Sequence, residues 1–171
     1  MRHVIFVLNG PNMNMLGVRE RGYYGSGTLD DLRVLCEAKA KSIGFAIDFR
    51  QSNYEEHVVE ACHEALTKAA GIVINPAALS FTSPSLVEAL RAFSGPKIEV
   101  HITNIYARDS IYHNSQISKV VTTVITGLGF DGYEYALDAV AGISAPSADA
   151  HRAEGAQACK LNGVRHCLKR C

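Results

Sequence analysis

The sequence predicts an α/β protein in which one doubly wound, five-stranded parallel sheet lies between two layers of helices. Three observations support this prediction. Short apolar runs of strand length alternate with stretches whose apolar residues recur at helical spacing. The run from Gly71 to Asn75 is β-branched and apolar on both faces, as expected of a strand covered by helices on two sides. The 171 residues fit one domain, in which right-handed crossovers join the parallel strands.

The first part of the chain shows clear boundaries between its elements. The first strand begins at His3 and stops in the Asn-Gly-Pro run that starts at Asn9. Thr28, with Asp31 three residues later, resembles a capping box, so a helix is expected from there to Gly44. The remaining expected strands are residues 45–49, 71–75, 97–102 and 120–126.

Three further helices are expected between and after these strands. Ser52 and Glu55 form a second capping pattern in front of one helix. Ser83 followed by Pro84 is typical of a helix start, with a capping residue and then a proline at the first helical position. The closing helix is expected over residues 133–140.

Charge and cysteine content exclude several classes of protein. Lys plus Arg equal Asp plus Glu at 17 each, so no net field draws the chain to nucleic acid or to an anionic membrane. The longest apolar runs have strand length and no secretory leader precedes them, so a cytoplasmic protein is expected. Cys36 and Cys62 fall within helical patterns and are interpreted as buried free thiols.

The composition changes near the end of the chain. From Gly142 onward it is dominated by Ser, Ala, Pro, Gly and charged residues, without a clear apolar period. We therefore expect one domain over residues 1–143 and a flexible tail over residues 144–171. Cys159, Cys167 and Cys171 crowd this tail, but no Cys-x-x-Cys pair is present, so no metal site is predicted.

Polar residues follow the strands at the points where the strands end. Glu99 and His101 are two positions apart on one expected strand, so their side chains share a face. A carboxylate there can fix the histidine tautomer and leave the second ring nitrogen to move a proton, or it can simply satisfy a buried histidine. The position at a carboxyl end favours function. Other polar residues expected at this edge are Asn9, Asn12, Gln51, Ser52, Asn53, Asn75, Thr103 and Asn104.

The loop after the first strand offers a candidate base. Tyr24 needs its phenolate favoured by about three pKa units, or about 4 kcal/mol, to act as a base near neutral pH. Arg19 lies on the same loop and Arg108 follows the fourth strand, and either guanidinium can favour the phenolate. The plainer interpretation is that Arg19 and Tyr24 are ordinary surface residues of a loop.

Ordered polar motifs follow the expected strands, and they are Asn9-Gly-Pro-Asn12-x-Asn14-x-Leu-Gly17, Arg19-Glu20, Tyr24-Gly25, Gln51-Ser52-Asn53, Ile74-Asn75-Pro76, Thr82-Ser83 and Glu99-Val-His101-Ile-Thr-Asn104-x-x-Ala-Arg108. With these motifs the sequence closely resembles the type II 3-dehydroquinate dehydratases, from about residue 3 to residue 141. The resemblance implies a flavodoxin-like fold, trimers grouped into dodecamers, and no metal or organic cofactor. It also implies anti dehydration of 3-dehydroquinate to 3-dehydroshikimate through an enolate, in the shikimate pathway or in quinate catabolism.

The resemblance also implies roles for single residues. Tyr24 would remove the proton next to the ketone, with Arg19 and Arg108 favouring its ionised form. Asn12 would stabilise the enolate through a water molecule. The loop around residues 19 to 24 would close over the substrate.

The second half of the reaction would use the fourth strand. His101 would be the general acid for the departing hydroxyl, oriented by Glu99. Asn75, the backbone amides of Ile102 and Thr103, and the Thr103 hydroxyl would hold the substrate carboxylate.

Three positions depart from the family pattern. Phe81 stands where the family usually has a histidine, and Tyr112 stands where it usually has an arginine. Both family residues bind the ring hydroxyls on the far side of the substrate from its carboxylate. Glu88 replaces an aspartate that reaches a neighbouring subunit's site. Because unpaired buried hydroxyls cost about 1–3 kcal/mol each, these changes should weaken binding of dehydroquinate.

Three interpretations therefore stay open. In the first, the chain is a dehydroquinate dehydratase in which His113 or Tyr112 substitutes for the missing groups. In the second, it is a paralogue that abstracts a proton from a different, less hydroxylated cyclic carboxylate and then eliminates or enolises. In the third, it is a non-catalytic binding or assembly protein. A base and an acid on opposite sides of a ligand are not needed for binding alone, so the two enzyme interpretations are preferred.

Overall fold

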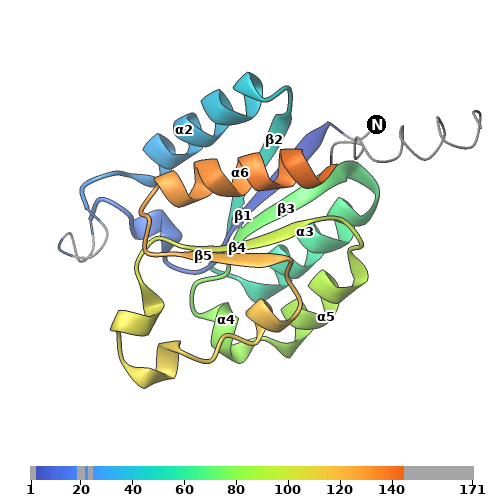
Figure 1. Cartoon of the computed structure of the whole chain (residues 1–171). Helices are drawn as coiled ribbons and strands as arrows, with labels where there is room; N and C mark the ends of the chain where they lie inside the picture. Colours follow the sequence, from blue (N-terminus) through green and yellow to red (C-terminus); the bar gives the residue numbers. More distant parts are fainter. Residues whose placement is uncertain (1–2, 19–21, 23–24, 145–171) are drawn as a thin grey trace, which may run out of the picture.

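A computed structural model describes residues 3–18, 22 and 25–144 of the chain, and its centre is a five-stranded parallel sheet (Figure 1). The strand order is β2-β1-β3-β4-β5, and all neighbouring pairs are parallel. The α/β fold class and the doubly wound parallel sheet are thus confirmed. The strands are β1 (Val4–Asn9), β2 (Ala46–Gln51), β3 (Ala69–Asn75), β4 (Lys97–His101) and β5 (Thr123–Thr126).

Helices cover both faces of the sheet and make a three-layer α/β/α arrangement. Figure 1 shows α2 and α6 together on one face and α3, α4 and α5 on the other. The chain leaves β1 toward β2 and then returns past β1 to β3, so the winding direction reverses between β1 and β3. At such a switch point a crevice opens beyond the carboxyl ends of the strands. The helices are α2 (Leu29–Ser42), α3 (Glu55–Lys68), α4 (Leu79–Thr82), α5 (Pro84–Ala92) and α6 (Asp131–Ser144).

Alternating strand residues supply two separate cores. On β1, Phe6 and Leu8 pack with the residues of α3 and α5, whereas Ile5 and Val7 pack with those of α2 and α6. This is the period of two that a strand buried on both faces must have. Tyr133 of α6 is the largest fully buried side chain among the described residues, and it belongs to the second core.

Two of the three predicted helix starts are confirmed, and one is wrong. Thr28 and Asp31 form a full capping box, and the Ser83 hydroxyl accepts a hydrogen bond from the third residue of α5. The pattern of Ser52 and Glu55 is not a cap, because the residue that precedes α3 is Tyr54 and it makes no side-chain cap. Glu55 instead accepts a hydrogen bond from the Ser83 hydroxyl at 2.7 Å and so ties α3 to the start of α5.

The ends of several elements differ from the prediction. The last strand starts at Thr123, because Val120 and Val121 follow a 3₁₀ turn over Ile117–Lys119 and pack against the core on the α3 and α5 face. The closing helix is longer than predicted at both ends and runs to Ser144. The rest of the expected tail lies outside the described residues. No described helix is long and apolar enough to cross a membrane.

The two cysteines within helices are free and buried, as predicted. Burial raises the pKa of the Cys36 thiol to about 12, helped by the nearby Glu134 carboxylate. Burial alone raises the pKa of the Cys62 thiol to about 12. Both side chains therefore act as small apolar groups in the two cores.

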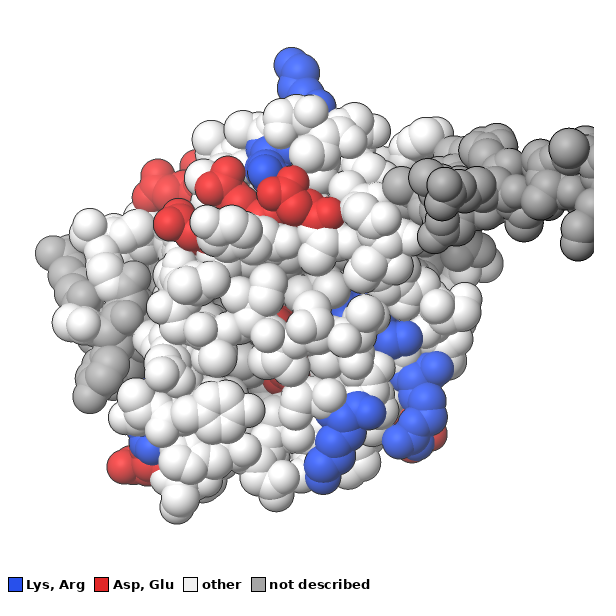
Figure 2. Space-filling model, viewed as in Figure 1, with Lys and Arg blue, Asp and Glu red and all other residues white. Residues whose placement is uncertain are grey.

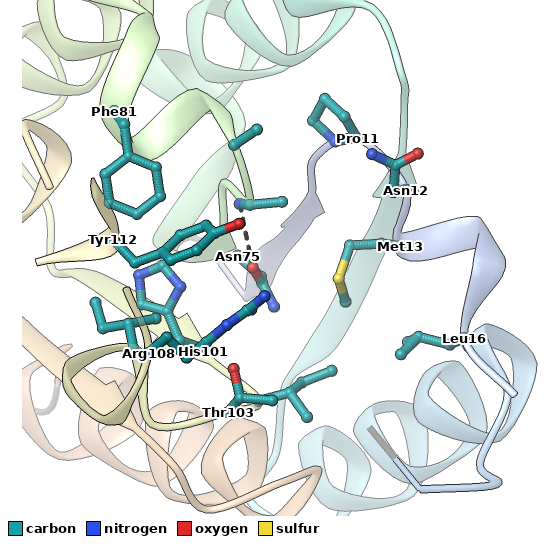
Figure 3. Close-up of a pocket in the computed structure, with 14 residues that line it drawn as sticks. Pro11, Asn12, Met13, Leu16, Asn75, Phe81, His101, Thr103, Arg108 and Tyr112 are labelled. Carbon is teal, nitrogen blue, oxygen red and sulfur yellow. Dashed lines mark hydrogen bonds between the residues drawn. The ribbon is translucent and has the colours of Figure 1, made fainter. Parts of the chain in front are cut away.

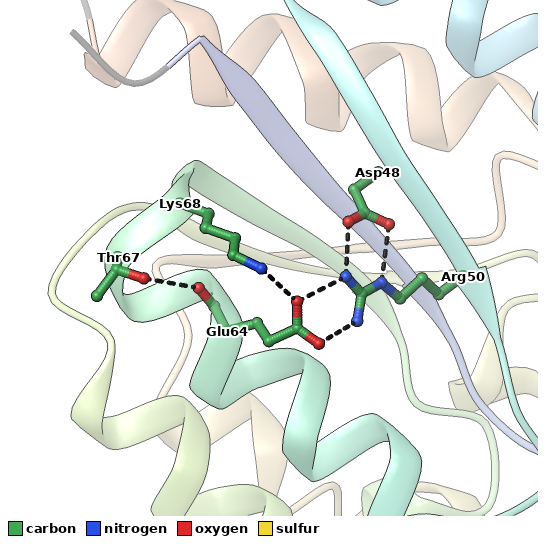
Figure 4. A network of polar contacts seen from close by, with 5 residues as sticks. All are labelled: Asp48, Arg50, Glu64, Thr67 and Lys68. Carbon is green, nitrogen blue, oxygen red and sulfur yellow. Dashed lines mark hydrogen bonds and ion pairs between the residues drawn. The ribbon is translucent and has the colours of Figure 1, made fainter.

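A chain of ion pairs fastens α3 to the edge strand β2 (Figure 4). The Arg50 guanidinium forms paired contacts with Asp48 at 2.7 Å and with Glu64 at 2.9 Å, and it lies 5.1 Å from the centre of the Phe6 ring. Lys68 adds a contact to Glu64 at 2.8 Å. Hydrogen bonds from Arg50 and Lys68 lower the pKa of the Glu64 carboxyl to about 2.

Charged side chains are unevenly distributed on the face shown in Figure 2. Acidic side chains gather over α2 and α6, and Lys and Arg side chains lie toward the α5 side of the molecule. The net charge of zero therefore conceals local fields of opposite sign on this face.

Candidate active site

A pocket of about 290 Å³ opens where the central strands end (Figure 3). The loops after β1, β3 and β4 form its walls, as the winding of the sheet requires. Both polar groups and apolar side chains line it. The polar members are Asn12, Asn75, His101, Thr103 and Arg108, and the apolar and aromatic members include Met13, Leu16, Phe81, Ile105 and Tyr112.

Glu99 and His101 form the pair that their spacing predicted. The distance between Nε2 of His101 and Oε1 of Glu99 is 2.9 Å. Glu99 is completely buried, whereas His101 is 6% exposed and lines the pocket. The hydroxyls of Ser80 and Ser115 donate to the same oxygen of Glu99, at 3.3 and 2.8 Å. The carboxylate thus lies behind the histidine and does not line the pocket itself.

Asn12 is held in place by a residue from the end of β2. It adopts a left-handed backbone conformation with φ of 66°, and its backbone N–H donates to Oδ1 of Asn53 at 2.9 Å. The Gln51 amide donates to the same oxygen and to the carbonyl of Gly10. Gln51, Ser52 and Asn53 do not line this pocket, so two of these three polar residues secure the loop that carries Asn12.

The loops after β1 and β3 touch each other directly. A side chain at Gly10 would place its first carbon 2.4 Å from the backbone oxygen of Pro76, so only glycine fits there. The backbone N–H of Gly10 donates to the Asn75 carbonyl at 2.8 Å. Ala77, with φ of 51°, donates its N–H to Oδ1 of Asn75 and fixes that side chain at the pocket wall.

Asn9 does not belong to the pocket, although it ends the first strand. It is 1% exposed, donates to the Arg50 carbonyl and accepts a hydrogen bond from the Tyr133 hydroxyl at 2.7 Å. Burial raises the pKa of the Tyr133 phenol, and a hydrogen bond with Asn75 partly offsets that rise. Asn9 therefore links the sheet to α6.

The segment after β4 is fixed by the turn after β5. The carbonyls of His101 and Ile102 accept hydrogen bonds from Gly127 and Gly129, and the Thr103 carbonyl accepts one from a threonine hydroxyl of β5. Because these carbonyls are engaged on the far side, the segment keeps a fixed position along the pocket floor. His101, Ile102 and Thr103 all line the pocket.

Two aromatic side chains form one wall of the pocket. The rings of Phe81 and Tyr112 meet edge to face, with centroids 5.7 Å apart. The Arg108 guanidinium lies 4.3 Å from the centre of the Tyr112 ring, a cation–π distance. His113 does not line the pocket, because its Nε2 contacts the carbonyl of Arg108 at 2.9 Å.

Among the described residues, one other predicted site residue does not line this pocket. Glu88 is on the exposed side of α5, where it pairs with Arg91 at 2.8 Å. Arg19 and Tyr24 lie outside the described residues. The sequence reasoning missed Ser80 and Ser115, which contact Glu99 from distant parts of the chain, and no local pattern marks either serine.

Comparison with known proteins identifies the family of this chain. The family model described as dehydroquinase class II matches residues 3–141. The 3-dehydroquinate dehydratase of Sinorhizobium medicae is 48% identical over 147 residues, which cover 86% of this chain and 99% of that protein. The enzyme called 3-dehydroquinate dehydratase 1 of Agrobacterium fabrum is 48% identical over 145 residues, which cover 85% of this chain and all of that protein.

Solved structures agree with the sequence comparison. The type II dehydroquinase from Propionibacterium acnes has a TM-score of 0.79 and 41% identity, and covers 83% of this chain and 98% of its own. A 3-dehydroquinate dehydratase-like protein from Bifidobacterium longum has a TM-score of 0.64 and 32% identity, and covers 84% of this chain and 98% of its own. The chain therefore belongs to the class II dehydroquinase family, and its sheet has the flavodoxin-like winding of that family.

Proposed function

We propose that this protein is a hydro-lyase that converts 3-dehydroquinate to 3-dehydroshikimate, a step of the shikimate pathway. Its family and its relatives named 3-dehydroquinate dehydratase support this function. The observation that carries the proposal is the buried Glu99 behind His101, with Asn12 on the other side of the same pocket (Figure 3). That arrangement provides a proton donor and a polar group for a developing negative charge in one cavity.

The reaction divides into two proton transfers. In the first, Tyr24 removes a proton from the carbon next to the ketone, and the electron pair moves onto the ketone oxygen to form an enolate. Arg19 and Arg108 favour the phenolate form of Tyr24, because a cation near a phenol stabilises its anion. Asn12 stabilises the negative oxygen of the enolate through a water molecule.

In the second transfer the hydroxyl leaves the neighbouring carbon. The enolate electrons return to form the carbon–carbon double bond, the carbon–oxygen bond breaks, and His101 supplies the proton that turns the departing hydroxyl into water. The buried Glu99 contacts Nε2 of His101, which leaves Nδ1 as the nitrogen that delivers the proton. Removal of the proton and departure of the hydroxyl as water thus use groups from different parts of the chain.

The substrate carboxylate binds at the end of β4. Asn75 and the backbone amides of Ile102 and Thr103 hold it, together with the Thr103 hydroxyl. The fixed carbonyls on the far side of this segment support that role, since they prevent the amides from turning away. Neutral hydrogen-bond donors of this kind bind an anion and also fix its orientation.

The aromatic wall favours a second candidate function. Phe81 and Tyr112 pack edge to face where the family usually has a histidine and an arginine for the ring hydroxyls. An apolar wall suits a cyclic carboxylate that carries fewer hydroxyls, and the same base and acid would serve a proton abstraction and elimination on it. Dehydroquinate is then a poor substrate rather than the best one.

The assembly proposed for the protein is a homo-oligomer built from trimers, as a dodecamer. Glu88 supports this proposal, because its side chain is 70% exposed on α5 and is available to a neighbouring copy. Sedimentation of the purified chain tests it, and a monomer at micromolar concentration would contradict it.

The enone absorbance of 3-dehydroshikimate provides the test of the main function. We expect folded wild-type protein to produce this absorbance from 3-dehydroquinate, and we expect Tyr24→Phe and His101→Ala to lose most of the rate. His63→Ala is the matched control, because His63 is an exposed histidine of α3 that does not line the pocket. A folded wild-type protein that produces no absorbance would remove the dehydratase function.

A further inference from the structure

All described contacts of the buried carboxylate fall on one of its two oxygens. Oε1 of Glu99 receives the hydroxyls of Ser80 and Ser115 and lies 2.9 Å from Nε2 of His101. Oε2 is buried and has no hydrogen-bond partner among the described residues. A buried carboxylate charge is costly unless donors surround it, so the two serine hydroxyls matter more here than they would on a surface.

The hydroxyl of Ser115 has little freedom to turn elsewhere. It accepts a hydrogen bond from the backbone N–H of Ser118 at 3.2 Å, and its own proton is directed to Glu99 at 2.8 Å. The side chain of Ser118 donates to the Ser115 carbonyl at 2.9 Å and closes the turn. Ser115 is therefore oriented by local backbone structure before it meets the carboxylate.

Ser80 reaches the same oxygen from α4, and the two serine segments are joined. The backbone N–H of Gln116 donates to the Ser80 carbonyl at 2.7 Å. Both serines are almost completely inaccessible to solvent, at 0% and 6% exposure. Phe81 follows Ser80 directly, so the segment that holds the carboxylate also carries part of the pocket wall.

We propose that Ser80 and Ser115 are positioning residues for the acid step of the reaction. They hold the Glu99 carboxylate in the orientation that keeps Oε1 hydrogen-bonded to Nε2 of His101. Nδ1 then gives its proton to the departing hydroxyl, which leaves as water, and the neutral imidazole keeps its Nε2–H on Glu99. The inference rests on the proposed dehydration, and it adds two groups that touch neither the substrate nor the histidine.

A purely structural role would give a different result from a positioning role. Loss of packing would lower stability and would affect substrate binding and turnover together. If Glu99 loses its orientation, the groups that bind the substrate carboxylate are unchanged, so KM stays constant while kcat falls. The conservative change Ser80→Thr keeps the hydroxyl and should preserve both constants.

The test compares Ser115→Ala with Ser118→Ala in the dehydration assay. Each variant loses a side-chain hydrogen bond within this turn, because the Ser115 hydroxyl accepts from the Ser118 N–H and the Ser118 hydroxyl donates to the Ser115 carbonyl. Only Ser115→Ala also loses a donor to Glu99. We expect Ser115→Ala to lower kcat about tenfold with KM within about twofold, since a hydrogen bond to a charged group is lost. Ser118→Ala should stay within about twofold of wild type in both constants. Ser80→Ala should fall between them, because its contact is the longer one.

A spectroscopic signal separates failure of the inference from failure of the proposed function. The Nε2–H proton of His101 should exchange slowly with solvent in wild type and in Ser118→Ala, and faster in Ser115→Ala. Wild-type protein without turnover would reject the dehydratase function while this signal still tests the serines. Equal exchange of that proton in the two serine variants, or an equal kcat, would overturn the positioning role.

Discussion

The aromatic wall gives the sharpest prediction about substrate choice. Replacing Phe81 by histidine and Tyr112 by arginine removes two rings whose centroids are 5.7 Å apart and offers polar groups to the substrate at the same wall. In the wild type, each ring hydroxyl of dehydroquinate that is buried against carbon without a hydrogen-bond partner weakens binding by about 1–3 kcal/mol. Restoring one partner then raises kcat/KM by about five- to 150-fold, and the double variant should gain at least tenfold.

The same change should make the protein less stable. The edge-to-face pair contributes about 0.5–1.5 kcal/mol beyond the burial of the rings. The contact of Arg108 with the Tyr112 ring, at 4.3 Å, adds about 0.5–1 kcal/mol. We therefore expect the double variant to gain catalytic efficiency while its melting temperature falls by several degrees.

The assay is the initial rate of enone absorbance over a range of dehydroquinate concentrations. Ile111→Arg is the matched control, because it adds the same charge one position away on a side chain that is 70% exposed and does not line the pocket. An unchanged or lower kcat/KM in the double variant, with the control near wild type, would refute the claim that the wall limits recognition of dehydroquinate.

Three further predictions concern stability and thiol reactivity. Tyr133→Phe leaves the buried Oδ1 of Asn9 without its donor and should lower the free energy of unfolding in urea by about 1–3 kcal/mol, whereas an unchanged value would mean that the hydrogen bond contributes nothing. Glu64→Gln removes a carboxylate whose pKa Arg50 lowers from 4.5 to about 2, so it should reduce stability at neutral pH. That difference from wild type should disappear as the pH falls through about 2, and a constant difference would contradict the assigned cause. The Cys62 thiol, with its pKa raised to about 12, should react with a thiol reagent at mildly alkaline pH only as fast as the protein opens, which peptide mass spectrometry can measure.

Much of the fold follows from local sequence because each strand and helix carries its own pattern. The continuous apolar run of β1 and the capping box at Thr28 were sufficient, because the burial of the strand and the capping of α2 agree with these patterns. The start of the last strand was not predictable from such patterns. Val120 and Val121 have strand-forming side chains, but tertiary packing places them against the core before the chain pairs with β4.

The site was predictable where its residues share one strand and unpredictable where they do not. The spacing of Glu99 and His101 was enough to place them on one face. Asn9 was expected at the site edge but does not line the pocket. Its side chain lies on the face of β1 that carries Val7, and that face packs against α6 and Tyr133. Ser80 and Ser115 are 35 positions apart, and only the folded chain brings both to Glu99.

The backbone at the pocket rim includes strained conformations that lower stability even without substrate. Asn12 and Ala77 are the only described residues other than glycine with positive φ, and both line the pocket. For alanine this conformation costs about 1–2 kcal/mol, a sizeable fraction of the few kcal/mol by which a domain stays folded. The pocket is thus preorganised at the expense of global stability. Selecting variants for heat resistance would tend to relax these two residues first, and would loosen the placement of Asn12 and Asn75 in return.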